Sequence, residues 1–81
     1  MNYTQLQLLL QNDELHYLSD DNGYSTPETI QQHTDILNQP PTFILYEYTI
    51  HDFTHTRNTL RHNNIKHSVY TDQYDMDYIM I

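Results

Sequence analysis

The sequence predicts a small α+β domain with a mixed three-stranded sheet and about three helices, in the order α-α-β-α-β-β. Three observations support this class. The apolar and aromatic run at 42–50 is typical of a buried strand, residues 65–81 alternate as two further strands would, and helix-start patterns occur in the segments between. At 81 residues, the chain is expected to form a single acidic domain spanning residues 1–81.

The first segment, residues 3–12, has helical periodicity, because Leu6 and Leu10 fall on one face. No helix breaker follows, so we expect the helix to continue to about Leu18. A short strand within residues 13–19 is an open alternative, because these residues also alternate in polarity.

A second helix is predicted after the turn at Asp20–Gly23. Thr26 can cap its N-terminus and Pro27 suits its first position, while Pro40–Pro41 requires it to end near Asn38. The residues that would face inward recur at helical spacing: Ile30, His33 or Thr34, and Leu37.

The strand at Thr42–Ile50 is expected to be covered on both faces, since it contains a single charge, Glu47. Asp52 can then cap a third helix that ends at Asn63–Asn64. Its inward face is narrow and consists of residues three or four positions apart: Phe53, Thr56 and Leu60.

Two alternating strands, Ile65–Thr71 and Tyr74–Ile81, complete the prediction. The two residues between them, Asp72–Gln73, indicate an antiparallel hairpin. The end of the last strand is apolar on both faces, so we expect it inside the sheet. The expected strand order is 1-3-2, with the third strand antiparallel to both neighbours.

Charge is the strongest compositional feature, with 11 acidic residues against three basic ones and a formal net charge of −8. Residues 1–56 contain eight acids and no Lys or Arg, and all three cations lie within Arg57–Lys66. Most acids therefore lack a nearby cation, and their field repels nucleic acids and anionic membranes while attracting basic partners. We expect no direct nucleic-acid binding and no membrane association.

Size and composition set further expectations. A chain this short buries only roughly 60% of its unfolded surface, which leaves no room for an interior cofactor and favours a homodimer. We therefore expect no cofactor. No segment approaches the roughly 18 apolar residues of a membrane span. The absence of cysteine excludes disulfides and thiolate metal sites, and it fits the cytoplasm.

The residues of kinds used in catalysis do not form a catalytic pattern, and we expect a protein that is not an enzyme. The serines have no nucleophile-elbow context, and a single glycine leaves no phosphate-binding loop. His51, His55 and His62 fall near one helix face, but two ligands on one helix do not make a metal site. The histidines could instead sense pH, because protonating all six would bring the formal charge from −8 to −2.

The segment from Val69 to Ile81 carries the most specific functional signal, because acids alternate there with tyrosine rings. Such a mixture provides contact area and charge complementarity at an interface. The competing interpretation is a packed tyrosine face whose acids only protect a strand edge. The predicted partner-binding residues are Tyr70, Asp72, Tyr74, Asp75 and Asp77, with Asp20 and Asp21 as a second acidic patch.

These features favour a non-catalytic acidic interaction module that binds a basic protein. By composition, it fits an inhibitor from a phage or mobile element, a DNA mimic of the anti-CRISPR kind, that occupies the basic surface of a nucleic-acid-binding protein or nuclease. The first alternative is a homo-oligomeric structural or regulatory domain whose acids serve solubility only. The second is a histidine-based metal-binding protein. The sequence does not identify the partner.

Overall fold

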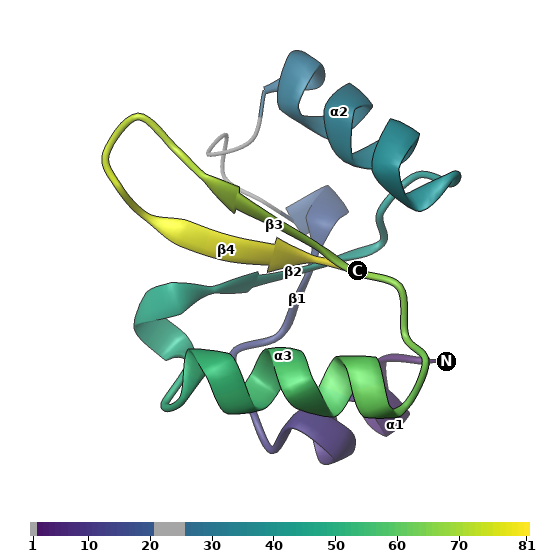
Figure 1. Cartoon of the computed structure of the whole chain (residues 1–81), viewed down its shortest axis with the longest axis vertical. Coiled ribbons are helices and arrows are strands. Elements are labelled where there is room, and N and C mark those ends of the chain that lie inside the picture. The colour runs from purple at the N-terminus through teal and green to yellow at the C-terminus, as the bar shows by residue number, and fades with distance from the viewer. Residues whose placement is uncertain (1, 21–25) are drawn as a thin grey trace.

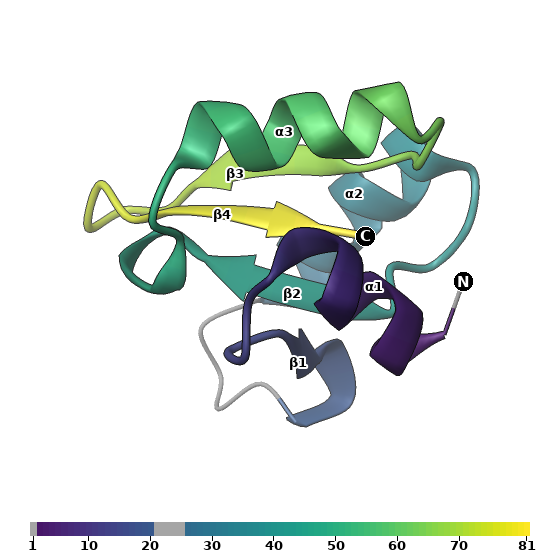
Figure 2. The same cartoon turned by 90° about the horizontal axis from the view of Figure 1, so that it is seen from below.

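The computed structural model describes residues 2–20 and 26–81, which form an antiparallel sheet with helices on both faces (Figure 1). Helices α1 and α3 cover one face, and α2 lies on the other (Figure 1, Figure 2). The α+β class and three α-helices are confirmed in this part of the chain. The elements in order are α1 (Tyr3–Leu10), β1 (His16–Tyr17), the 3-10 turn η1 (Leu18–Asp20), α2 (Pro27–Leu37), β2 (Phe43–Tyr46), the 3-10 turn η2 (Glu47–Thr49), α3 (Phe53–His62), β3 (Ser68–Thr71) and β4 (Asp77–Met80).

The sheet has four strands in the order β1-β2-β4-β3, and every pairing is antiparallel. As predicted, the last strand lies between the other two predicted strands and runs antiparallel to both. The prediction of a mixed, three-stranded sheet is wrong, because all pairings are antiparallel and the short strand β1 adds a fourth strand at the free edge of β2.

The segment after α1 differs from the expected helix. The helix ends at Leu10, and Gln11 follows with a left-handed backbone at φ 52°. The buried side chain of Asn12 then fixes the chain direction, because its Oδ1 accepts the N–H of Glu14 at 2.7 Å and its Nδ2 donates to the carbonyl of Thr49 at 2.9 Å. These contacts favour the extended alternative and leave Leu15 only 1% exposed.

The two faces of the sheet bury separate apolar clusters. Beneath α1 and α3, the cluster consists of Leu6, Leu15, Phe43, Leu45, Leu60 and Ile79. On the face that carries α2, it consists of Ile44, Tyr46, Tyr78 and Met80. All four residues of β2 are buried, so the prediction of a strand covered on both faces is confirmed for Phe43–Tyr46.

The helix caps follow the sequence signals. Thr26 accepts the backbone N–H of Thr29, and Pro27 occupies the first position of α2. Asp52 caps α3 by accepting the N–H of His55 at 3.0 Å. On α2, His33 and Leu37 are buried as predicted, whereas Ile30 is only half-buried and Thr29 is buried instead.

Three predicted boundaries are wrong. The strand expected at 42–50 ends at Tyr46, and η2 begins at the next residue, Glu47. The strands expected at 65–71 and 74–81 shorten to β3 and β4, and the hairpin connection spans residues 72–76 instead of two residues. As a result, the end of the sheet where β2 stops and β3 connects to β4 consists of turns instead of regular strands.

Within residues 2–20 and 26–81, none of the helices has the length and apolar character that a membrane-spanning segment requires.

Candidate functional site

The hairpin connection between β3 and β4 is organised by one carboxylate. Asp72 Oδ1 accepts the N–H of Tyr74 at 2.8 Å and that of Met76 at 3.0 Å, while the Asp72 N–H donates to the Met76 carbonyl at 3.0 Å. Asp75 adopts a left-handed backbone with φ 59°, a conformation that short polar side chains tolerate. The loop is therefore a hydrogen-bonded turn that holds its side chains in defined positions.

A second carboxylate joins this hairpin to η2. Glu47 Oε2 accepts the N–H of Asp77 at 3.1 Å, and Asp77 in turn accepts the hydroxyl of Thr71. Both views show the hairpin tip and the turn after β2 at the same end of the sheet (Figure 1, Figure 2). Four acidic residues, Glu47, Asp72, Asp75 and Asp77, therefore lie at one end of the sheet.

Tyrosines form a row across the sheet beside these acids. Tyr46 pairs with Tyr78 in register, and Tyr78 pairs with Tyr70. Their ring centroids lie 5.9 Å and 5.2 Å apart. Tyr48 continues the row beyond the strands, because its ring stacks on Tyr46 at 5.6 Å. The row thus leads from the packed sheet to the turn at its end.

Exposure separates the rings that pack from the rings that are accessible. Tyr78 is fully buried and Tyr70 is half-buried against His33, whereas Tyr48 is 70% exposed and Tyr74 is 76% exposed. The two accessible tyrosines and the four acids define what we call the hairpin-end surface: Glu47, Tyr48, Asp72, Tyr74, Asp75 and Asp77. Both figures show α2 at some distance from the hairpin tip.

The predicted partner-binding residues fall into three groups. Asp72, Tyr74, Asp75 and Asp77 belong to the hairpin-end surface, and Tyr70 lies behind it in the tyrosine row. Asp20 is exposed in η1, which follows β1 beyond the Thr42 end of β2 and thus lies at the opposite end of the strands. Asp21 lies outside the described residues.

Sequence reasoning missed Glu47 and Tyr48. It assigned both to a strand covered on two faces, whereas the strand stops at Tyr46 and both side chains are exposed in η2. A signal was present, because Tyr46–Glu47–Tyr48 repeats the mixture of acid and ring that marks the hairpin.

No cation neutralises the hairpin-end surface from within the described chain. The ion pair found in residues 2–20 and 26–81 joins Glu14 and His16 at 3.6 Å, and none involves a Lys or Arg. Arg57 and Arg61 belong to α3, and Lys66 precedes β3. The four acids of the surface therefore keep their charge unpaired.

One serine and one histidine are hydrogen-bonded, as a nucleophile and its base would be, but both are buried. His33 Nδ1 is hydrogen-bonded to Ser68 Oγ, and the two residues are 1% and 6% exposed. Burial lowers the pKa of His33, and its Nε2 has no hydrogen-bond partner among the described residues. A substrate cannot reach Ser68 in this arrangement, so the pair acts as a packing contact between α2 and β3.

The histidines predicted near one helix face, His51, His55 and His62, do not form a metal site in the described chain. His51 and His55 line one pocket with Asp52, whereas His62 lies at the far end of α3. Within residues 2–20 and 26–81, no three His, Cys, Asp or Glu side chains are placed to hold a metal ion together.

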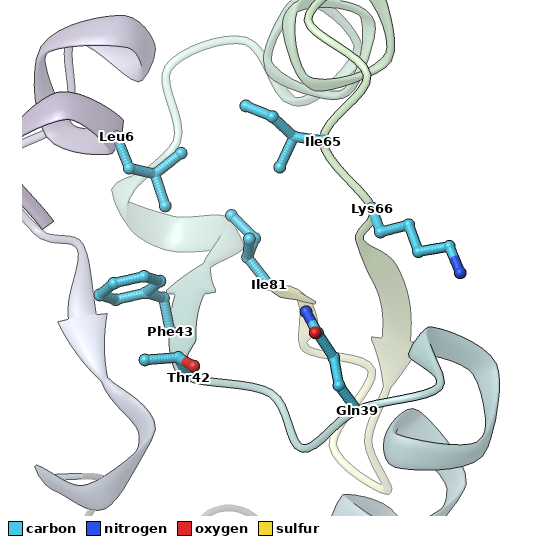
Figure 3. A pocket seen from close by; sticks show the side chains of 7 residues that line it. All are labelled: Leu6, Gln39, Thr42, Phe43, Ile65, Lys66 and Ile81. Atoms are coloured by element: carbon cyan, nitrogen blue, oxygen red, sulfur yellow. The ribbon is translucent and has the colours of Figure 1, made fainter. Parts of the chain in front are cut away.

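A pocket of about 290 Å³ lies between α1, the start of β2 and the segment before β3 (Figure 3). Leu6, Ile65 and Ile81 point into this pocket, while the amine of Lys66 points away from it. Gln39 and Thr42 add polar groups to the lining, but no Asp, Glu or histidine side chain among the described residues lines this pocket. No family model, curated protein or solved structure matches this chain.

Proposed function

We propose that this chain is a non-catalytic interaction module that binds a basic partner protein through the hairpin-end surface. The observation that carries this proposal is the grouping of four carboxylates with two exposed tyrosines, Tyr48 and Tyr74. The described chain supplies no Lys or Arg partner to any of these carboxylates.

The negative charges of this group of residues indicate which kind of partner it can bind. Like charges held close together repel one another, and the net charge of −8 adds to that repulsion. A partner surface rich in Lys and Arg relieves the repulsion and is steered toward it. The exposed tyrosines add rigid contact area with little loss of side-chain entropy.

The finer proposal concerns the kind of basic partner. Acids interleaved with flat rings offer the two kinds of group that a nucleic-acid-binding groove recognises, namely negative charges and stacking surfaces. We therefore propose a cytoplasmic inhibitor that occupies the nucleic-acid-binding surface of a nuclease or related protein. A phage or mobile element is the proposed origin, on composition alone.

A second copy of the chain is a less suitable partner for this surface. A symmetric dimer places the same patch on both subunits, so each carboxylate group would face another carboxylate group. Such like-charge contacts oppose association. Light scattering at low and high salt tests this point, because a dimer formed through the hairpin-end surface would strengthen as salt screens the repulsion.

The main experiment begins with capture of a partner from the native host at low salt, followed by titration of the purified partner. Asp72, Asp75 and Asp77 are changed together to Asn, which keeps an acceptor oxygen for the loop hydrogen bonds. We expect affinity to fall about tenfold or more, with a weaker salt dependence, because three charge pairs are lost.

A matched control removes the same charge elsewhere. The variant Asp13→Asn, Glu14→Gln, Asp35→Asn changes three exposed acids outside the hairpin-end surface. It should retain most of the affinity. Equal affinity and equal salt dependence for the wild type and the hairpin variant would refute the proposal.

A further inference from the structure

The hairpin-end surface contains a pocket that the acidic residues alone do not explain. Its volume is about 300 Å³, and its lining comes from two segments that are far apart in the chain. The end of β2 and η2 supply Tyr46 and Tyr48, and the hairpin connection supplies Asp72, Tyr74 and Met76.

The walls of this pocket are mainly aromatic. Tyr46 and Tyr48 stack with an interplanar angle of 23° and centroids 5.6 Å apart, so they form one continuous wall. Tyr46 is 7% exposed and fixes the position of this wall, while Tyr48 and Tyr74 are the most exposed rings that line the pocket. Ring faces carry negative electrostatic potential and attract cations that lie over them.

The charge at the pocket is negative. Asp72 uses Oδ1 for both of its loop hydrogen bonds, which leaves Oδ2 without a partner among the described residues. Asp75 follows on the same turn, and no Lys or Arg contributes to the lining. An anionic ligand would meet repulsion here, and a neutral apolar ligand would leave the carboxylate uncompensated.

We infer that this pocket receives an arginine side chain from the basic partner, with its guanidinium stacked on tyrosine and hydrogen-bonded to Asp72. This inference rests on the proposed function and names the group that its central contact recognises. Arginine fits better than lysine, because the guanidinium is planar, stacks on aromatic faces and donates through a fork that matches a carboxylate. A lysine ammonium is a strongly hydrated point charge that gains less from flat walls.

The test compares binding of two blocked peptides of equal charge, hexaarginine and hexalysine, to the full chain at low salt. The informative variant is Tyr48→Ala with Tyr74→Ala, because both side chains are largely exposed and no buried side chain is removed. The matched control is Tyr48→Phe with Tyr74→Phe, which keeps both ring faces.

The wild type should bind hexaarginine more tightly than hexalysine. The alanine variant should lose about tenfold in hexaarginine affinity and lose the preference for arginine, whereas the phenylalanine control should keep both. Changes in the NMR signals of Tyr46 and Met76 on adding hexaarginine should locate the contact in the pocket.

The outcomes separate the two proposals. Equal binding of both peptides by the wild type, or unchanged hexaarginine binding by the alanine variant, would overturn the arginine pocket. The proposed function would survive that result if the Asp72, Asp75 and Asp77 variant still lost affinity for both peptides. Failure of both peptides to bind the wild type at low salt would refute both proposals.

Discussion

Replacement of His33 should change how the stability of this protein depends on pH. The ring is 1% exposed, shares a hydrogen bond with Ser68 and meets Tyr70 edge-on at 5.4 Å. Burial lowers the pKa of His33 below its ordinary value of 6.5. Between the lowered folded value and 6.5, the unfolded chain binds more protons than the folded chain. Stability should therefore fall as the pH drops through the unfolded value.

The size of the effect has an upper limit set by one proton. For a ring that stays neutral when folded, the free energy of unfolding decreases by on the order of 1 kcal/mol between roughly pH 7.5 and pH 5.5. The variant His33→Asn removes this titration while keeping an amide at the position of Nδ1, facing Ser68. The variant will be less stable overall, since the contact with Tyr70 is lost.

The assay is urea unfolding followed by circular dichroism at several pH values. We expect the wild type to lose more stability than His33→Asn on acidification, and the exposed-site control His55→Asn to resemble the wild type. Because the wild type and His33→Asn share the remaining histidines, the difference between their pH dependences of stability reports on His33 alone. Parallel loss of stability in the wild type and His33→Asn would refute the reasoning.

Three further pairs of substitutions test the fold. In each pair, the cost is the loss of free energy of unfolding measured in urea. Asn12→Ala should cost about 1–3 kcal/mol, because both ends of its buried amide are hydrogen-bonded, whereas Asn58→Ala on exposed helix surface should cost little. Thr26→Ala should cost about 1 kcal/mol through loss of the α2 cap, and Thr26→Ser should restore it. Leu60→Ala should cost about 2–5 kcal/mol, against less than about 0.5 kcal/mol for Leu8→Ala, since Leu60 is fully buried and Leu8 is 72% exposed. Equal costs within any of these pairs would contradict the packing described.

Much of the fold could be predicted because its signals are local. Thr26 and Pro27 begin α2, Asp52 begins α3, and in each case the cap bonds a backbone group three residues away. The apolar run at Phe43–Tyr46 identified β2, and its hydrophobicity required cover on both faces. The short connection after β3 predicted its pairing with β4, and the apolar end of the last segment predicted that β4 lies inside the sheet, next to β2.

The hairpin-end surface could be predicted only in part. The sequence identified Asp72, Tyr74, Asp75 and Asp77 because they are neighbours in the chain, and chain neighbours in a turn remain neighbours in space. It did not join Glu47 to them, because the hydrogen bond from the Asp77 N–H to Glu47 spans 30 positions. It named Asp20 as part of a second acidic patch by charge alone, and only the register of β1 shows that Asp20 lies at the other end of the strands.

The sequence by itself determined the helix starts, the buried strand and the excess of negative charge, since each depends on residue type and short-range spacing. Only the tertiary structure decided that residues 16–17 form a strand, that β2 stops at Tyr46 and that two separate segments share one tyrosine-walled pocket. The physical reason is that these features depend on contacts between distant segments, such as the hydrogen bond from Asn12 to Thr49, 37 positions apart. Local propensity does not encode such contacts, and the packing of the whole chain selects them.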